Sequence, residues 1–405
     1  MTARPIVVMK FGGTSVATPE GRGAIANRVT EALELDRAPV IVVSAMGRAG
    51  APYATDTLLG LVGELPADPR ERDLLASTGE LISAVVVAHE LRAAGVDALA
   101  FTGAEAGIVT DGAHENAAIM EIHPGTLLAA IARGGVPVVA GFQGIAPDGR
   151  VTTLGRGGSD TTACALGVAL DAHAVEIYTD VDGVMTADPR TCGGAAVLDV
   201  ISADELFQMA KHGSRVVHMP AAELALASGL AVRVRNTYTD HPGTQVADIA
   251  SYRPASVATA VSHSTGVARI RVDLPPEDDA AAHMAAQTRV FRSMADAAVS
   301  LDMFTPSAAT LVFTLPEADV DRASEVLLSL GMAHEVRGGL AKITLVGAGM
   351  HGVPGVMARV AESLAEAGVN VLQVADSHTT ISVLIAADEA DRAVGALHDG
   401  FGLGE

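Results

Sequence analysis

The chain has 405 residues, enough for two or three domains with cores of their own. Its 49% hydrophobic content, 42 glycines and lack of tryptophan fit an α/β enzyme rich in small residues. Its formal net charge of −21 argues against nucleic acid or an anionic membrane as a partner, although a local basic pocket for phosphates is compatible with it.

Two further features narrow the class of protein. The two cysteines, Cys164 and Cys192, supply neither a metal cluster nor a disulfide framework. The first residues, MTARPIVVMKF, are too few and become polar too quickly for a signal peptide, and no run of ~18 apolar residues follows. We therefore expect a cytoplasmic protein.

The N-terminal segment has the order of a phosphate cradle. Pro5–Phe11 is a short apolar strand that contains Lys10, and Gly12 and Gly13 precede a helix expected over Pro19–Leu35. Strand, glycine turn and helix can bind a phosphate, with Lys10 as a point charge. The segment is not a P-loop, and two glycines after a strand also occur in ordinary turns. This stretch alone leaves both interpretations open.

The next segments alternate between strands and helices. Pro39–Ser44 is expected to be a buried parallel strand, followed by a polar loop over Ala45–Asp56. Residues 70–94 are expected to be helical but interrupted at residues 77–80 (STGE). Glu80 then has two interpretations: a solvated residue at a helix break, or a carboxylate directed at a substrate ammonium.

Residues 152–190 are the most informative stretch. Two short strands, Asp97–Phe101 and Val136–Phe142, and a hairpin-like turn at residues 147–150 lead into it. Residues 156–160 (RGGSD) combine a cation, two glycines, a hydroxyl and a carboxylate ahead of a helix expected over Thr162–Leu170, with Asp160 and Thr161 as its N-cap residues.

An acidic loop follows the next expected strand, Ala174–Thr179, and carries Asp180, Asp182 and Asp188. Ligands of open α/β sheets bind at the carboxyl ends of the strands. The cationic turn and the acidic loop therefore predict a site for two ligands.

A helix over Ala203–His212 and a last strand over Ala231–Arg235 complete a doubly wound α/β domain that we expect to end near residue 246. Residues 244–266 are expected to be a polar linker with one strand, Ser256–Ser262.

The C-terminal part contains an internal repeat. Residues 268–272 (ARIRV) match residues 341–345 (AKITL), and residues 290–299 match residues 360–369. Each copy is expected to fold as β-α-β-β-α-β over ~70 residues, a ferredoxin-like pattern. Such modules either bind small molecules in pairs or serve only in oligomerisation.

Four motifs together resemble the aspartate kinases of the amino-acid kinase superfamily: residues 10–15 (KFGGTS), 77–80 (STGE), 155–160 (GRGGSD) and 179–190 (TDVDGVMTADPR). The repeats resemble the paired ACT domains that regulate these kinases. Residues 44–47 (SAMG), 52–56 (PYATD) and 375–380 (ADSHTT) are most similar to monofunctional Bacillus-type isozymes.

The resemblance implies an α/β amino-acid kinase fold with a mostly parallel sheet, followed by two ferredoxin-like ACT domains. The implied boundaries are a catalytic domain at 1–246, a linker at 247–266 whose strand joins the second ACT domain, a first ACT domain at 267–340 and a second at 341–405.

The resemblance also implies roles for individual residues. The reaction would be phosphorylation of the β-carboxylate of L-aspartate by MgATP, the first step of the lysine, threonine and methionine pathway. Lys10 and Asp160 would be catalytic, with Asp160 near the magnesium and no direct protein metal site. ATP would contact Lys10, Phe11, Gly12, Gly13, Thr179, Asp180, Met185, Arg190 and Arg215. Aspartate would contact Ser44, Thr55, Glu80, Arg156, Gly157, Gly158 and Ser159.

Regulation would occur through the second ACT domain, where Met350, Val353, Gly355 and Asn370 would bind a feedback amino acid of the aspartate pathway. The alternative role of the glycines at 347–355 is to let the sheets of two subunits pack together. A homodimer or larger homo-oligomer through the ACT domains is expected. The first repeat has residues 275–279 (PPEDD) in place of the glycine loop and Ser300 in place of Asn370, so its loop is not expected to bind an amino acid.

Three departures from the family pattern concern the nucleotide. Arg215 stands where many members have lysine, Met219-Pro220 replaces a Pro-Arg pair, and Met185 replaces a tyrosine. Two further functions stay open at this point: a kinase acting on an aspartate analogue, and a catalytically weak regulatory subunit.

Overall fold

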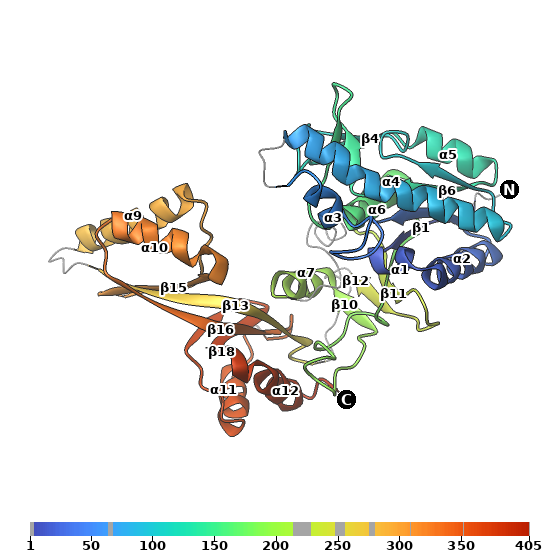
Figure 1. Cartoon of the computed structure of the whole chain (residues 1–405). Coiled ribbons are helices and arrows are strands. Elements are labelled where there is room, and N and C mark those ends of the chain that lie inside the picture. Colours follow the sequence, from blue (N-terminus) through green and yellow to red (C-terminus); the bar gives the residue numbers. More distant parts are fainter. Residues whose placement is uncertain are drawn as a thin grey trace. The chain divides into compact units, whose positions relative to one another are not determined.

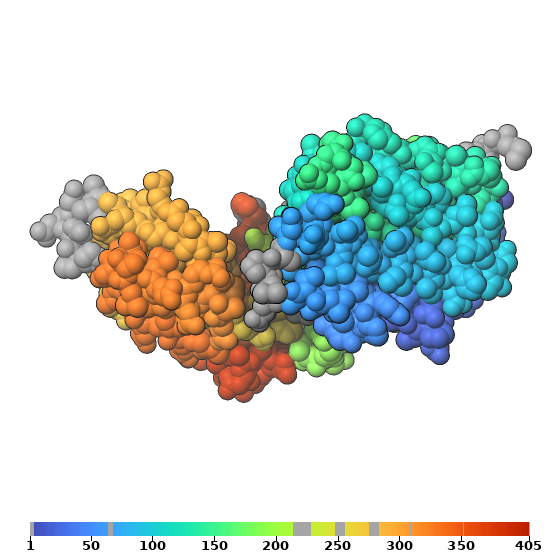
Figure 2. All heavy atoms as spheres, turned by 45° about the horizontal axis from the view of Figure 1, so that its top comes forward, coloured from blue at the N-terminus to red at the C-terminus, as the bar shows by residue number. Residues whose placement is uncertain are grey.

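The computed structural model describes residues 4–63, 68–213, 228–247, 256–274, 280–307, 309–350 and 352–404. The chain divides into two compact units. The first contains the N-terminal part up to Val184, together with residues 197–211 and 228–247. The second contains residues 185–196, 212–213 and the described part of 254–405. In Figures 1 and 2 the first unit is coloured from blue to yellow-green, and the second mainly from gold to red.

The first unit is built on a mostly parallel sheet. Its strand order is β10-β12-β11-β9-β1-β2-β6-β3, and β11 and β12 are the antiparallel pair. The central strands are apolar on both faces; β2, for example, is buried at every position. The strands are β1 Ile6–Phe11, β2 Ala38–Val43, β3 Ala98–Phe101, β6 Val136–Ala140, β9 Ala174–Thr179, β10 Val200–Ser202, β11 Val232–Asn236 and β12 Thr244–Ala247.

Helices cover both faces of this sheet, which confirms the doubly wound α/β expectation (Figure 1). Val7, Met9 and Phe11 of β1 pack with α2 and α4 in one core. Lys10 alternates with them and projects to the opposite face, against which α6 packs. The helices are α1 Gly13–Ala17, α2 Pro19–Glu34, α3 Thr55–Gly60, α4 Pro69–Ala93, α5 Gly125–Ala132, α6 Gly158–Ala169 and α7 Ala203–Lys211.

The first unit also contains a second, four-stranded sheet. Its order is β5-β4-β7-β8, with β4 Ile108–Thr110, β5 Ile119–Ile122, β7 Gln143–Ile145 and β8 Val151–Thr153. The antiparallel pairing of β7 and β8 confirms the hairpin expected around residues 147–150.

The expected interruption of α4 at residues 77–80 is wrong, because the helix runs unbroken through them. Ser77 and Thr78 bond carbonyl oxygens of the preceding turn, at 2.9 and 2.6 Å. Gly79 is required by packing: a Cβ there would lie 2.8 Å from the Cβ of Ala45 and 3.0 Å from the carbonyl oxygen of Tyr53. The glycine therefore lets a neighbouring loop approach the helix.

Helix α4 is also the one helix of the described chain that is long and apolar enough to cross a membrane by length and composition. Half of its apolar window is buried inside the protein, and it packs along β3, β6 and β8. Blue and cyan segments that include α4 make up much of the visible surface of the first unit (Figure 2). Its buried face carries Asp73 and Glu80, as a core helix beside a polar site would.

The expected N-cap of α6 is also wrong. The helix begins at Gly158 after Gly157, which has a left-handed φ of 70°, so Asp160 lies inside the first turn. The expected linker start needs a correction too, because Thr244–Ala247 is a strand of the catalytic sheet, antiparallel to β11.

The second unit contains one six-stranded sheet in the order β14-β15-β13-β16-β18-β17. Two long strands run through both halves of it: residues 267–272 of β13 pair with 334–340 of β16, and residues 260–265 pair with 341–346. The strands are β13 Ala260–Asp273, β14 Asp302–Pro306, β15 Thr310–Pro316, β16 His334–Val346, β17 Gln373–Asp376 and β18 Thr380–Ala386.

Each half of this sheet is covered by its own helix pair, α9 and α10 at one end and α11 and α12 at the other (Figure 1). The helices are α9 Ala280–Asp296, η1 Glu317–Asp319, α10 Val320–Ser329, α11 Val356–Glu366, η2 Ala387–Glu389 and α12 Ala390–Gly400. Both halves have the ferredoxin-like arrangement expected for an ACT pair.

The loop at residues 185–196 packs within the second unit. Ala187 and Cys192 are buried in the core formed around α11 and α12, and the Thr186 hydroxyl lies 2.9 Å from Nε2 of the buried His398. The sequence predicts one continuous catalytic domain that ends at residue 246. The structure instead assigns the loop at residues 185–196, which lies within this range, to the second unit.

Candidate active site

A pocket of about 420 Å³ opens at the carboxyl ends of β1, β2 and β6 in the first unit, where α/β sheets bind ligands. Three segments line it: the turn after β1, the loop after β2 and the turn before α6. Its lining includes all seven residues expected to contact aspartate, namely Ser44, Thr55, Glu80, Arg156, Gly157, Gly158 and Ser159.

The two residues expected to be catalytic lie side by side in the pocket. The Lys10 ammonium is 2.6 Å from Oδ1 of Asp160, and both side chains are largely buried. Lys10 comes from the end of β1 and Asp160 from the first turn of α6. The pair places a cation and an anion at the helix N-terminus, where an additional anion is also favoured.

Gly13 is fixed by the approach of another loop. A Cβ at this position would lie 2.6 Å from the carbonyl oxygen of Ala45 and 2.7 Å from that of Gly47. The Gly47 N–H also donates to the Gly13 carbonyl at 2.9 Å. The glycine turn is therefore part of the packing between the loops after β1 and β2, and it lines the pocket as well.

Glu80 is a buried acid, and only one of its two carboxyl oxygens has a hydrogen-bond partner among the described residues. Its side chain is 3% exposed, and Oε1 accepts from the Ala45 N–H at 3.0 Å. Oε2 is buried without a hydrogen-bond partner among the described residues. Burial raises the pKa of Glu80 to about 8, against the lowering effect of the Ala45 hydrogen bond. The interpretation of Glu80 as a solvated residue is wrong.

Arg156 lies in a turn of glycines at the mouth of the pocket. Gly155 and Gly157 on either side of it have left-handed φ angles of 71° and 70°. Arg156 itself is exposed and has no ion-pair partner in the part of the chain that the structure describes. Among the described residues its charge is therefore available to a ligand anion.

Asp180 and Asp182 of the acidic loop after β9 have different partners. Asp180 pairs with Arg48 at 3.1 Å, and Arg48 lines the pocket. Asp182 accepts from Asn236 and Thr239 at 2.7 and 2.6 Å, and these hydrogen bonds hold its pKa below the usual value. Of the two, only Asp180 is connected to the pocket.

Three of the residues expected to contact the nucleotide, Phe11, Met185 and Arg190, are not among the described residues that line this pocket. The Phe11 side chain is fully buried and stacks on Tyr178, with ring centroids 4.7 Å apart. Met185 and Arg190 belong to the loop that packs in the second unit, where Arg190 pairs with Asp188 at 2.6 Å. Arg215 lies outside the described residues.

Of the four residues expected to bind an effector, Met350, Val353 and Gly355 lie around the start of α11, whereas Asn370 follows the other end of this helix, which ends at Glu366. Gly355, with φ of 91°, immediately precedes the helix, which begins at Val356. Met350 is buried in the core and Val353 is exposed. Asn370 is exposed and lies three residues before β17.

Two glycines of the expected effector loop have a packing function inside the unit. A Cβ on Gly347 would lie 2.5 Å from the carbonyl oxygen of Val257, and one on Gly349 would lie 3.0 Å from that of Ser256.

Several pocket residues were not expected from the sequence. Arg48 and Arg72 add two cations to Lys10 and Arg156, and Phe142, which has a left-handed φ of 69°, also lines the pocket. Asp73, Glu115 and Thr153 also line the pocket. Only Arg48 had a signal, because it lies within the loop between two motifs. The others depend on contacts between distant segments.

Comparisons with known proteins agree with this geometry. The amino acid kinase family matches residues 5–236, and an ACT domain matches residues 335–399. The chain is 42% identical over 405 residues to aspartokinase 1 of Bacillus subtilis (strain 168), covering 98% of this chain and 99% of that protein. It is 41% identical over 417 residues to an aspartokinase of Mycolicibacterium smegmatis, with 98% and 96% covered.

Solved structures show the same similarity. Aspartokinase III of E. coli in complex with aspartate and ADP, in its R-state, matches with a TM-score of 0.78 and 25% identity, covering 98% of this chain and all (100%) of that one. The complex of the same enzyme with lysine and aspartate, in its T-state, matches with a TM-score of 0.75 and 26% identity, with 98% and 99% covered.

Proposed function

The chain belongs to the amino acid kinase family and, within it, to the aspartokinases, and from this premise we propose how its pocket phosphorylates aspartate. The enzyme transfers a phosphoryl group from ATP to the β-carboxylate of L-aspartate, giving 4-phospho-L-aspartate and ADP. This reaction serves amino-acid biosynthesis. The individual residue roles are our proposal.

The observation that carries the proposal is the unsatisfied Glu80. A carboxylate oxygen buried without a partner is costly unless a ligand donates to it. The ammonium of an amino acid is such a donor. Arg156, which lines the same pocket and has no ion-pair partner among the described residues, provides a bidentate site for the α-carboxylate. Ser44, Thr55 and Ser159, with the backbone of Gly157 and Gly158, supply the remaining polar contacts.

The proposed nucleotide side begins at Lys10. Its ammonium, with the turn at Phe11, Gly12 and Gly13, faces the phosphates, and Thr179 and Asp180 lie along the nucleotide. Met185, Arg190 and Arg215 complete this set by resemblance to the family. The complex of the E. coli relative with aspartate and ADP supports nucleotide use by this fold.

Catalysis in this proposal consists of alignment and charge neutralisation. The β-carboxylate, with a reference pKa of ~3.9, is already ionised at neutral pH, so no general base is needed to activate it. The barrier comes from bringing two anions into line. Lys10, fixed by Asp160 at 2.6 Å, presents a preorganised positive charge where the transferred group develops negative charge.

Magnesium fits this site as a companion of ATP. No group of three or more His, Cys, Asp or Glu side chains suited to a metal occurs among the described residues. Asp160 is the carboxylate that would lie near the ion, which the phosphates of ATP would carry. When bound, the ion neutralises phosphate charge.

The second unit is proposed to regulate the enzyme by binding a product amino acid of the pathway. The T-state complex of the E. coli relative with lysine supports feedback control in this family. We propose Met350, Val353, Gly355 and Asn370 as the effector site, ACT domains at 267–340 and 341–405, a catalytic domain whose sheet extends to residue 247, and a cytoplasmic homo-oligomer assembled through the ACT domains.

A coupled assay of ADP release tests the proposed function. Rates are compared with aspartate, with glutamate and without an acceptor. The proposal predicts ADP release that depends on aspartate and is much slower with glutamate, whose extra methylene displaces the reacting carboxylate. Equal rates with both acids would favour an analogue as the natural substrate, and no acceptor-dependent rate would favour a regulatory subunit.

A further inference from the structure

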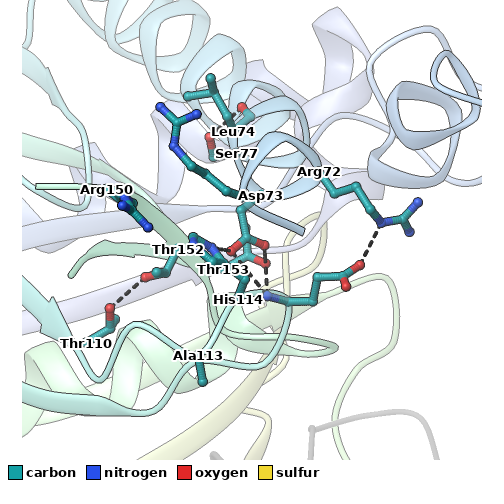
Figure 3. Close-up of polar contacts among 12 residues, drawn as sticks. Arg72, Asp73, Leu74, Ser77, Thr110, Ala113, His114, Arg150, Thr152 and Thr153 are labelled. Atoms are coloured by element: carbon teal, nitrogen blue, oxygen red, sulfur yellow. Dashed lines mark hydrogen bonds and ion pairs between the residues drawn. The ribbon is translucent and has the colours of Figure 1, made fainter. Parts of the chain in front are cut away.

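One side of the pocket contains a buried acid that the roles above do not use. Asp73 projects from the first turns of α4 and is 1% exposed. Figure 3 shows it between Thr153 of β8 and His114 of the loop that precedes β5. Together with Glu115, these residues form a hydrogen-bonded cluster that we call the Asp73 cluster.

The oxygens of Asp73 are fully engaged by the protein. Oδ1 accepts from the Thr153 hydroxyl at 2.6 Å and from the Glu115 N–H at 3.0 Å. Oδ2 accepts from the same N–H at 3.2 Å and lies 2.6 Å from Nδ1 of His114. A carboxylate can only accept, so the imidazole donates this bond. Asp73 therefore lines the pocket but is already saturated with protein donors.

The cluster holds Glu115 in a conformation that non-glycine residues rarely adopt. Glu115 has φ of 67°, and such a backbone persists only where surrounding contacts over-determine it. Its N–H is fixed by Asp73, and its side chain is fixed by Arg72, whose Nε lies 2.6 Å from Oε1. Both anchors belong to α4, so the helix sets the position of this loop.

The loop in turn supports the turn that carries Arg156. The Ala117 N–H donates to the Thr153 carbonyl at 2.9 Å. A Cβ on Gly155 would lie 2.7 Å from Oδ1 of Asn116 and 3.3 Å from the carbonyl oxygen of Glu115. The residue next to Arg156 is therefore packed directly against the loop that Asp73 anchors, and Thr153 lies only three residues before Arg156.

We propose that Asp73 is a positioning residue for aspartate: through Thr153 and Glu115 it fixes the turn at residues 154–157 and so aims Arg156 at the α-carboxylate. This inference rests on the role proposed above for Arg156. Asp73 does not touch the substrate. A displacement of Arg156 by a fraction of an ångström weakens a bidentate grip on a carboxylate while leaving the Lys10 side of the pocket in place.

Thr153→Val provides the main test, because it removes one hydroxyl from the cluster and keeps the shape of the side chain. Thr152→Val is a matched control: Thr152 is the neighbouring residue of β8, equally buried, and its hydroxyl bonds Thr110 at 2.6 Å on the side away from Asp73 (Figure 3). Steady-state kinetics are measured for both variants with aspartate and ATP varied in turn.

We expect Thr153→Val to raise the KM for aspartate about tenfold, with kcat and the KM for ATP changed less than about twofold, and Thr152→Val to leave all three within about twofold. Asp73→Asn is expected to act in the same direction more strongly. Equal effects of the two threonine variants, or equal loss for both substrates, would overturn the proposal and leave the cluster with a structural role only.

The double variant Thr153→Val/Arg156→Lys shows whether the effect passes through Arg156. Once the guanidinium fork is gone, Thr153→Val should raise the KM for aspartate less than about twofold further. If the two substitutions raise the KM for aspartate by factors that multiply in the double variant, the inference is contradicted. If Arg156→Lys alone leaves the KM for aspartate unchanged, the role proposed for Arg156 fails. If Arg156→Lys raises it but Thr153→Val does not, only the inference about Asp73 fails.

Discussion

Glu80→Gln should improve the stability of the empty enzyme in alkaline solution and at the same time weaken aspartate binding. The wild-type carboxyl is buried, with one oxygen unpartnered, and burial raises its pKa from 4.5 to about 8. The glutamine keeps an acceptor for the Ala45 N–H but carries no charge at any pH.

The sign of the stability effect follows from proton uptake. Between pH 4.5 and about 8 the folded protein keeps the Glu80 proton that the unfolded chain has lost, so stability falls as pH rises through this range. The full difference corresponds to roughly 5 kcal/mol above pH 8, at about 1.4 kcal/mol per pKa unit. Glu80→Gln escapes this loss, so its unfolding midpoint should exceed that of the wild type at pH 9 and approach it at pH 5.

The affinity of the wild type for aspartate should rise with pH, whereas its stability falls. The ammonium of aspartate pairs with the ionised carboxylate, so binding below pH 8 releases a proton from Glu80. Because the ionised fraction falls from one half at pH 8 to about one hundredth at pH 6, the dissociation constant for aspartate should rise about fiftyfold over that range.

Titration calorimetry in two buffers with different ionisation enthalpies measures both the affinity and the protons released. We expect release of nearly one proton per aspartate at pH 6.5 in the wild type, and weak, pH-independent binding without proton release in Glu80→Gln. An affinity for aspartate that is constant between pH 6 and pH 8 in the wild type would refute the assignment of Glu80 to the ammonium.

Three other substitutions separate the remaining roles. Lys10→Ala should leave a folded protein with kcat lower by at least ~10²-fold, because it removes a preorganised charge; turnover like that of the wild type would reject the phosphate cradle. Arg156→Lys should raise the KM for aspartate far more than the KM for ATP in steady-state kinetics, and equal changes would mean that Arg156 is structural or contacts ATP. Asn370→Ala should shift the inhibition curve for a pathway amino acid to higher concentration without changing the uninhibited rate, and identical curves would remove Asn370 from the effector site.

The main lines of the fold were predictable because local patterns and the global fold agree. Continuous apolar runs such as Val40–Val43 become buried parallel strands, and the two copies of the repeat become the two halves of one sheet. Glycine turns at strand ends bring the motif residues together, so all seven residues expected to contact aspartate line one pocket.

The errors arise where a distant contact overrides a local signal. Gly79 looks like a helix breaker in sequence, but it is the point at which the loop at residues 45–54 touches α4. Asp160 looks like a cap, but the left-handed Gly157 starts the helix earlier and turns Asp160 toward Lys10. Short elements such as β12 carry too few residues to show a period.

The contacts of Asp73 and the packing of the loop at residues 185–196 could not be predicted from the sequence, for a different reason. The donors to Asp73 come from residues 114, 115 and 153, which are far away in the chain. The loop at residues 185–196 reads as part of the catalytic domain, but Ala187 and Cys192 pack in the core of the second unit. Neither arrangement leaves a periodic or compositional signal.

The central claim is that this pocket aligns the β-carboxylate of aspartate with the terminal phosphate of ATP. Trapping with hydroxylamine tests it most directly, because an acyl phosphate reacts to give a hydroxamate that can be quantified and identified by mass. With aspartate and ATP we predict aspartyl β-hydroxamate in equal amount to ADP, and none when aspartate is omitted. ADP release in the presence of aspartate without any hydroxamate would contradict the account.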